Sequence, residues 1–318
     1  MPEPHVPTGA RPARRARGAA LALSAALVLP LALAAGSGSA AAAPGGHHDG
    51  RTAPHRHPHL NTHKYVALGD SYAAGIGIPD NVGMPAGCGR SNHNYASLTA
   101  KGIGFARFTD VTCGGAKTVD MTQPQTVTGG VNPAQLNAVT ADTSVVTLQI
   151  GGNDIGFGEI IGTCASVSAS DPFGDPCHKL YTAGGTDQLA GRIDATAAKV
   201  ASVVRGIRWR APHARILVLG YPAILPDSGV GCFPTVPVAM GDAPYLRDTQ
   251  KRLNAMIAAQ AGRNGARYVD VYGPSVGHDA CQPTGRWVEG VNPSTPFHPN
   301  AVGHEGMAAA VAAALPPR

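Results

Sequence analysis

Short hydrophobic runs alternate with longer amphipathic segments along residues 64–314. The runs at 64–68, 144–150 and 214–220 are apolar almost throughout, which predicts buried strands. Residues 267–271 and, more weakly, 105–111 are further strand candidates. Helices are expected over three segments, 189–209, 243–261 and 300–314, the last of them directly after Pro299, a residue suited to a helix start.

This alternation of apolar strands and amphipathic helices predicts a parallel sheet covered on both faces. Ligands of such α/β sheets bind beyond the carboxyl ends of the strands. Four intervening segments are rich in glycine, proline and cysteine and are expected to be loops: 79–104, 156–186, 221–242 and 273–297.

Residues 1–43 have the layout of a secretory signal peptide. A basic patch at 11–17 precedes an apolar run at 19–35, and small residues lead to Ala43. The run is short and is interrupted by Pro30, which disfavours a membrane anchor. We expect a secreted, extracellular protein, with the export route and the cleavage site left open.

Residues 44–63 are rich in histidine, proline and glycine, and a disordered linker is expected there. These histidines have no second type of ligand at a fixed spacing, so no metal site and no cofactor are predicted. The remaining residues, 64–318, are numerous enough for one domain with a sizeable core, and no proline- or serine-rich break divides them.

Charge and cysteine content narrow the class of protein further. The formal net charge is +5, but residues 1–63 hold six arginines and two acidic residues, so little net charge is left for the rest. Nucleic-acid binding is therefore not predicted.

Six cysteines in an exported chain indicate disulfides, and the lack of a C-x-x-C pair argues against a zinc ribbon. Sequence alone leaves the connectivity open, although sequential pairing is the simplest.

Four short segments carry candidate chemistry. Gly-Asp-Ser-Tyr follows the first strand and presents Ser71, whose hydroxyl needs a general base to act as a nucleophile. Gly-Gly-Asn-Asp follows the strand at 144–150 and presents Asn153, an amide donor suited to an oxyanion. A glycine pair after Cys113 offers backbone N–H donors. His298 precedes Pro299, which favours an extended backbone that aims the imidazole from a helix entrance.

In this order, the four segments closely resemble the SGNH (GDSL-type) hydrolase family, from Tyr65 to Ala314. The chain is most similar to the secreted bacterial lipases and esterases that contain three disulfides. The resemblance implies a three-layer αβα sandwich with a flavodoxin-like, mostly parallel five-stranded sheet. It also implies the disulfides Cys88–Cys113, Cys164–Cys177 and Cys232–Cys281.

Site roles follow from the same resemblance. Ser71 is the expected nucleophile and His298 the expected general base. The expected oxyanion donors are the N–H of Ser71, the N–H of Gly115 and the side chain of Asn153, with Gly114 as the near alternative to Gly115.

One position departs from the usual pattern of the family. Many members carry an aspartate three residues before the catalytic histidine, where this chain has Thr295. As in the subgroup that it resembles, we expect the Thr295 main-chain oxygen to orient His298, with Glu289 and Asp279 as fallback acids. Asp70 and Asp154 are interpreted as structural residues of their turns, and His304 as a packing or capping residue.

These features predict a carboxylic ester hydrolase, a lipase or esterase, that acts on fatty acyl esters such as triacylglycerols through a Ser–His acyl-enzyme mechanism. Isoleucines and Phe157 beside the expected catalytic turns favour a fatty acyl chain over a sugar. The alternatives are a phospholipase A-type enzyme, a carbohydrate acetyl esterase and, from another class, a non-catalytic secreted binding module. Expected partners are a lipid or small ester substrate and, transiently, a lipid surface; the chain is expected to be a monomer.

Overall fold

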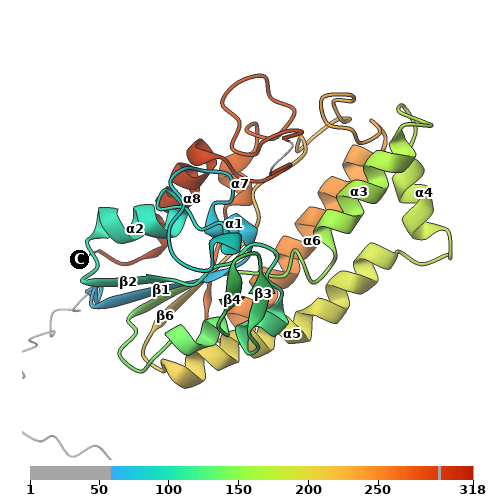
Figure 1. Cartoon of the computed structure of the whole chain (residues 1–318). Coiled ribbons are helices and arrows are strands. Elements are labelled where there is room, and N and C mark those ends of the chain that lie inside the picture. The colour runs from blue at the N-terminus through green and yellow to red at the C-terminus, as the bar shows by residue number, and fades with distance from the viewer. Residues whose placement is uncertain (1–58, 293–294, 318) are drawn as a thin grey trace, which may run out of the picture. The chain divides into compact units, whose positions relative to one another are not determined.

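The computed structural model describes residues 59–292 and 295–317 (Figure 1). The expected signal peptide and most of the expected linker lie outside these residues. The last linker residues, 59–63, are described and belong to the folded domain. Leu60 is 9% exposed, and its N–H donates to the carbonyl of Pro317 at 3.1 Å. The domain therefore begins before Lys64, because this segment pairs with the C-terminal residues.

The central sheet has five strands, which are β1 (Lys64–Gly69), β2 (Arg107–Asp110), β5 (Val145–Gln149), β6 (Arg215–Leu219) and β7 (Arg267–Val269). Their order is β2-β1-β5-β6-β7, and all neighbouring pairs are parallel. Counted along the chain this is the order 2-1-3-4-5 of flavodoxin-like sheets, so the predicted fold class is confirmed. The order reverses between β1 and β5, which is where ligands bind in such folds.

Helices cover both faces of the sheet because successive strand residues point to opposite sides (Figure 1). In β1, Val66 and Leu68 join the larger hydrophobic core, whereas Tyr65 and Ala67 join the smaller one. The larger core includes the buried faces of α5 (Gln188–Arg210) and α6 (Asp242–Arg263). The smaller one includes those of α2 (Tyr95–Ile103) and α8 (Ala301–Ala314).

Two segments that were expected to be loops contain helices. α2 lies within 79–104, and α3 (Phe157–Ser168) and α4 (Pro176–Thr182) lie within 156–186. The buried face of α2 includes two alanines and a threonine, so its hydrophobic pattern is faint, yet the Asn94 side chain caps its first turn by accepting from the N–H of Ser97. Shorter elements complete the described fold: α1 (Ser71–Ala74), α7 (Tyr272–Ser275), the antiparallel pair β3 (Gln125–Val127) and β4 (Gly130–Asn132), and the 3-10 turns η1 (Ala86–Cys88), η2 (Thr118–Met121) and η3 (Gln135–Ala138).

All six cysteines form disulfides, in the pairs Cys88–Cys113, Cys164–Cys177 and Cys232–Cys281. These are the pairs that the resemblance implies. The second of them joins α3 to α4. Among the described helices, none combines the length and the apolar character needed to cross a bilayer.

Candidate active site

Ser71 lies at the start of α1, directly after β1. Gly69 ends the strand at φ +153°, where a Cβ would approach the Gln149 carbonyl to 2.6 Å, so glycine is required. The Gln135 side chain accepts from the Gly69 N–H and donates to the Gly69 carbonyl. Asp70 caps α1 by accepting from the Tyr72 N–H at 3.0 Å. The turn that presents the Ser71 hydroxyl is therefore fixed from both sides.

His298 faces Ser71 across the end of the sheet. The distance from Ser71 Oγ to His298 Nε2 is 2.8 Å. His298 Nδ1 lies 2.9 Å from the carbonyl oxygen of Pro296, and because a carbonyl can only accept, Nδ1 carries the hydrogen. In the neutral ring Nε2 is then unprotonated and accepts from the serine hydroxyl, as a general base must.

The carbonyl that orients His298 belongs to Pro296, not to Thr295 as predicted. Phe297 adopts a left-handed backbone at φ 60°, and the turn at 295–298 directs the carbonyl two residues before His298, instead of three, at the ring. Thr295 is 8% exposed, and its side chain occupies the space where a Cβ on Gly77 would lie. The turn keeps the expected kind of acceptor but shifts it by one residue.

Aromatic rings surround the imidazole of His298. Tyr72 lies 4.9 Å away between ring centroids, and Phe157 lies 6.3 Å away edge to face. Burial lowers the pKa of His298 below its usual range, although the hydrogen bond to Pro296 opposes this shift. His298 is thus held in its neutral, basic form near neutral pH.

The glycine pair after Cys113 is tied to the strand that leads to Ser71, because the Cys113 N–H donates to the Gly69 carbonyl at 3.0 Å. The Gly114 N–H donates to the Cys88 carbonyl at 2.9 Å, so it is occupied. The Gly115 N–H has no acceptor within the described part of the chain, and Gly115 adopts φ +74°. Of the two glycines considered from the sequence, Gly115 is therefore the one whose backbone N–H is available to donate to an oxyanion.

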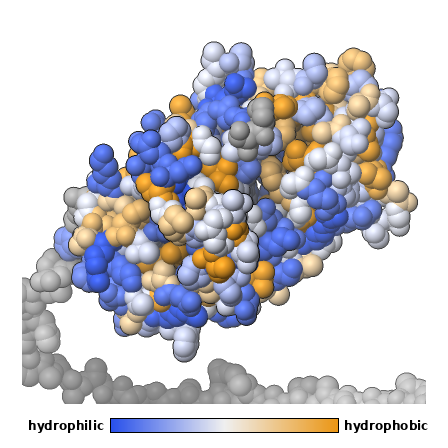
Figure 2. Space-filling model, in the orientation of Figure 1, coloured by the Kyte–Doolittle hydropathy of each residue, from blue (hydrophilic) through white to orange (hydrophobic). Residues whose placement is uncertain are grey.

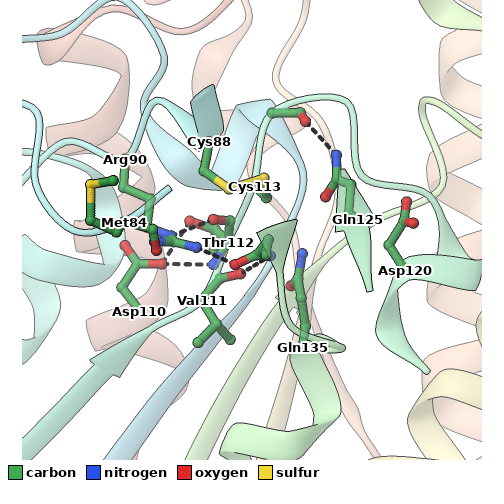
Figure 3. Close-up of a disulfide and its surroundings, with 12 residues drawn as sticks. Met84, Cys88, Arg90, Asp110, Val111, Thr112, Cys113, Asp120, Gln125 and Gln135 are labelled. Carbon is green, nitrogen blue, oxygen red and sulfur yellow. Dashed lines mark hydrogen bonds between the residues drawn. A yellow bond between two sulfur atoms is a disulfide. The ribbon is translucent and has the colours of Figure 1, made fainter. Parts of the chain in front are cut away.

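The disulfide Cys88–Cys113 and Gln125 hold this glycine turn in place (Figure 3). Gln125 Nε2 donates to the Gly114 carbonyl at 2.8 Å. Asn153 Nδ2 donates to the Ala116 carbonyl at 2.9 Å, which also links the turn to the end of β5. An amide NH₂ group has two hydrogens, so Asn153 retains one for another acceptor.

Ser71 and Asn153 open into one apolar pocket between the sheet end and helices α3 and α6. Its hydrophobic lining is Tyr72, Ile155, Phe157, Ile160, Ile161, Tyr221, Ile224, Leu225, Leu246 and Leu253. The polar lining side chains Thr249 and Gln250 bond to backbone groups of this chain. The pocket therefore presents mainly hydrocarbon beside a serine hydroxyl.

The remaining acidic and histidine candidates have structural contacts. Asp154 accepts from the N–H and the hydroxyl of Thr118, and Asp70 caps α1. The carboxylates of Glu289 and Asp279 accept hydrogen bonds from other residues, and Glu289 meets His298 through its backbone N–H, which donates to the His298 carbonyl at 2.9 Å. His304 is fully buried and accepts the Tyr95 N–H at 2.9 Å, at the start of α2.

Three further residues that shape the site were missed by sequence reasoning. They are Tyr72, Gln135 and Tyr221, which hold the catalytic turns through hydrogen bonds. Tyr72 is the one with a sequence signal, because it directly follows Ser71. Gln135 and Tyr221 lie far from the other segments in sequence, and nothing local marks them. Within the described ranges, no cluster of three His, Cys, Asp or Glu side chains is arranged to hold a metal ion.

Comparison with known proteins places this geometry in a family. Residues 67–305 match the sequence profile described as the GDSL-like Lipase/Acylhydrolase family. A protein named Lipase 2 from Streptomyces coelicolor is 43% identical over 251 residues, which cover 77% of this chain and 83% of that protein.

Two solved structures are also similar. Phospholipase A1 from Streptomyces albidoflavus NA297 superimposes with a TM-score of 0.68 at 28% identity, covering 79% of this chain and 98% of the other. An extracellular lipase from Streptomyces rimosus gives a TM-score of 0.66 at 28% identity, covering 80% of this chain and all of the other (100%). Together with the serine at the strand end, these matches establish that the chain belongs to the GDSL-like lipase/acylhydrolase family and is an ester hydrolase.

Proposed function

We propose that the protein is a secreted lipase or esterase that hydrolyses fatty acyl esters at Ser71 through a covalent acyl-enzyme. The observation that carries this proposal is a serine hydroxyl that lines an apolar pocket and lies 2.8 Å from an oriented imidazole. An activated serine supplies the nucleophile, and the pocket supplies a binding site for hydrocarbon.

In the first half-reaction, Ser71 Oγ attacks the ester carbonyl carbon while His298 Nε2 takes its proton. The carbonyl oxygen becomes an oxyanion that accepts from the N–H of Ser71, the N–H of Gly115 and Asn153 Nδ2. The protonated imidazole then gives its proton to the alkoxide leaving group, so the alcohol departs and the acyl group remains on Ser71.

In the second half-reaction, water attacks the acyl-enzyme. His298 removes a proton from the water, and the same donors stabilise the second tetrahedral intermediate. Collapse of that intermediate returns the proton to Ser71 Oγ and releases the carboxylic acid. The Pro296 carbonyl stabilises the protonated ring less than a carboxylate would, so the dyad relies on the oxyanion donors for much of its rate.

The apolar pocket is the proposed acyl site. Apart from Ser71 and Asn153, its polar side chains Asp70, Thr249 and Gln250 are hydrogen-bonded within the chain. They therefore leave few free groups that could bind a polar substrate. Burial of each methylene contributes about 0.8 kcal/mol, so esters of longer acids gain binding energy until the pocket is full.

An exposed hydrophobic end supports transient contact with a lipid surface. Hydrophobic residues are exposed over α3 and α4 (Figure 2). Phe173, between these helices, is 79% exposed, and Leu180 on α4 is 43% exposed.

Three disulfides are typical of exported proteins, which supports secretion. A monomer is sufficient for the chemistry, because all the proposed site residues come from one chain.

The test is a panel of p-nitrophenyl esters of graded chain length together with a phospholipid. Ser71→Ala is expected to abolish hydrolysis while leaving the circular dichroism spectrum unchanged, and Asn153→Ala to lower kcat roughly 10²–10³-fold. Full activity of Ser71→Ala would refute the assignment. Preference for the phospholipid over triacylglycerol would redirect the substrate class, and preference for acetyl esters of sugars would contradict the acyl pocket.

A further inference from the structure

A buried tyrosine hydroxyl connects the two proposed catalytic turns. Tyr221 follows β6 and is 4% exposed. Its hydroxyl donates to Asp70 Oδ2 at 2.6 Å and accepts from the Gly152 N–H at 2.8 Å. Asp70 directly precedes the proposed nucleophile Ser71, and Gly152 directly precedes the proposed oxyanion donor Asn153.

The backbone of Tyr221 is fixed independently of these contacts. Asn254 on α6 accepts the Tyr221 N–H at 2.8 Å and donates to the Tyr221 carbonyl at 2.9 Å. The ring packs edge to face on Tyr72 at 5.1 Å between centroids. Tyr221 therefore acts as a rigid strut that is anchored in α6.

Gly152 is adapted to this contact. A Cβ at that position would lie 3.2 Å from both the Tyr221 hydroxyl oxygen and the adjoining ring carbon, so a side chain would press on the tyrosine. The turn before Asn153 thus approaches the tyrosine more closely than other residues would easily allow. A merely space-filling aromatic ring would not need such a contact at its hydroxyl.

We propose that Tyr221 is a positioning residue whose hydroxyl sets the relative placement of Ser71 and Asn153. The nucleophile and the oxyanion donor lie on different strand ends, and the reaction needs both at one carbonyl group. Small displacements of such groups cost large factors in rate, because donors stabilise the oxyanion only at short range. This inference rests on the proposed roles of Ser71 and Asn153.

Tyr221→Phe removes the hydroxyl and keeps the ring. We expect kcat for short p-nitrophenyl esters to fall roughly 10- to 100-fold while KM changes less than threefold, because the strut affects the transition state more than ground-state binding. Affinity for a tetrahedral mimic, such as an alkyl boronic acid, should fall in parallel with kcat. Affinity for a fatty acid product should stay unchanged.

Tyr65→Phe is the matched control. The Tyr65 hydroxyl is also fully buried and lies 2.8 Å from the Thr147 hydroxyl, but Tyr65 does not line the pocket. We expect this variant to lower the melting temperature without lowering kcat. If Tyr221→Phe behaved in the same way, with a lower melting temperature and kcat within twofold of wild type, the proposal would be overturned.

A double-variant cycle separates this proposal from the proposed function. In an Asn153→Ala background, Tyr221→Phe should cost much less than it does in the wild type, because the donor that it positions is gone. Equal costs in the two backgrounds would contradict a role through Asn153. If Asn153→Ala itself had no effect, the oxyanion assignment would fail instead. Should Tyr221→Phe not fold, Asn254→Ala releases the Tyr221 backbone from α6 and should lower kcat with the same coupling to Asn153→Ala.

Discussion

At the scale of single residues, the proposed role of His298 as general base means that its protonation should set the pH range of the reaction. Hydrolysis needs the neutral ring, and burial lowers its pKa. Activity should therefore be retained as the pH falls through 6.5 and be lost only at lower pH. A pH profile of kcat/KM measures this limb. Asp70→Asn should lose activity at the same acid pH as the wild type. A loss that began above pH 7 would indicate a carboxylate partner that raises the pKa of His298.

Tyr72 links the turn of the proposed nucleophile to the loop that carries the proposed base. Its hydroxyl donates to the Phe297 carbonyl at 2.5 Å, and Phe297 holds a left-handed backbone at φ 60° that costs energy in a phenylalanine. Tyr72→Phe should lower kcat about three- to tenfold, the value of one hydrogen bond. The measurement is kcat of this variant on a short ester. An unchanged kcat would show that ring packing alone holds His298.

Sequence reasoning reached the residues proposed to react but not those that hold them in place. The segments around Ser71, Gly115, Asn153 and His298 are short and contain their own signals. The Pro296 acceptor was misplaced by one residue because the left-handed Phe297 has no signature in the sequence. Tyr221 was missed because its contacts span 69 and 151 residues.

At the scale of elements, two disulfides should affect catalysis differently. Cys88–Cys113 holds the turn with Gly115, whereas Cys164–Cys177 joins α4 to α3, which lines the acyl pocket. Replacing the first pair by alanine should lower kcat for esters of every chain length. Replacing the second should raise KM for long esters and leave kcat for short ones.

The ester panel distinguishes these outcomes in the two double variants. The same kinetic change in both would contradict separate roles for the disulfides. Loss of folding in either variant would be detected by circular dichroism before the kinetics are compared.

Strands and long helices were predicted from the sequence because burial gives them strong patterns. β1, β5, β6, α5 and α8 begin and end close to their expected positions. α3 and α4 were missed because glycine, serine and proline weaken the helical pattern there, and α3 begins after a glycine rather than a capping side chain. α3 lines the pocket and α4 is joined to it by a disulfide, so the shape of the pocket was less predictable than its chemistry.

At the scale of the whole molecule, acid should weaken the fold through His304. Burial lowers the pKa of His304 to about 3, whereas in the unfolded chain it titrates near 6.5. Below pH 6.5, His304 binds a proton in the unfolded chain but not in the folded one. The free energy of unfolding should therefore fall as the pH drops from about 6.5 towards 3. The shift sets an upper limit of about 5 kcal/mol for this loss.

Urea unfolding at a series of pH values measures this contribution. His304→Gln should flatten the decline below pH 6.5 relative to wild type, and an unchanged slope would contradict the assignment.

Asp70 contributes to the free energy of unfolding with the opposite dependence on pH. Burial raises its pKa from 3.8 to about 7, so its contribution is fully present below pH 3.8 and is lost as the pH rises from there to about 7. Asp70→Asn at the same pH values identifies that part.

The central claim is that Ser71, activated by His298, becomes acylated at the mouth of the hydrocarbon pocket. A long-chain alkyl phosphonate with a p-nitrophenyl leaving group tests it directly, because only an activated nucleophile displaces that group. Peptide mass spectrometry should find one phosphonate per chain, on Ser71, with labelling much slower in His298→Ala and faster for long alkyl chains than for methyl. Activity lost through labelling at another residue, or an active enzyme with unlabelled Ser71, would contradict the account.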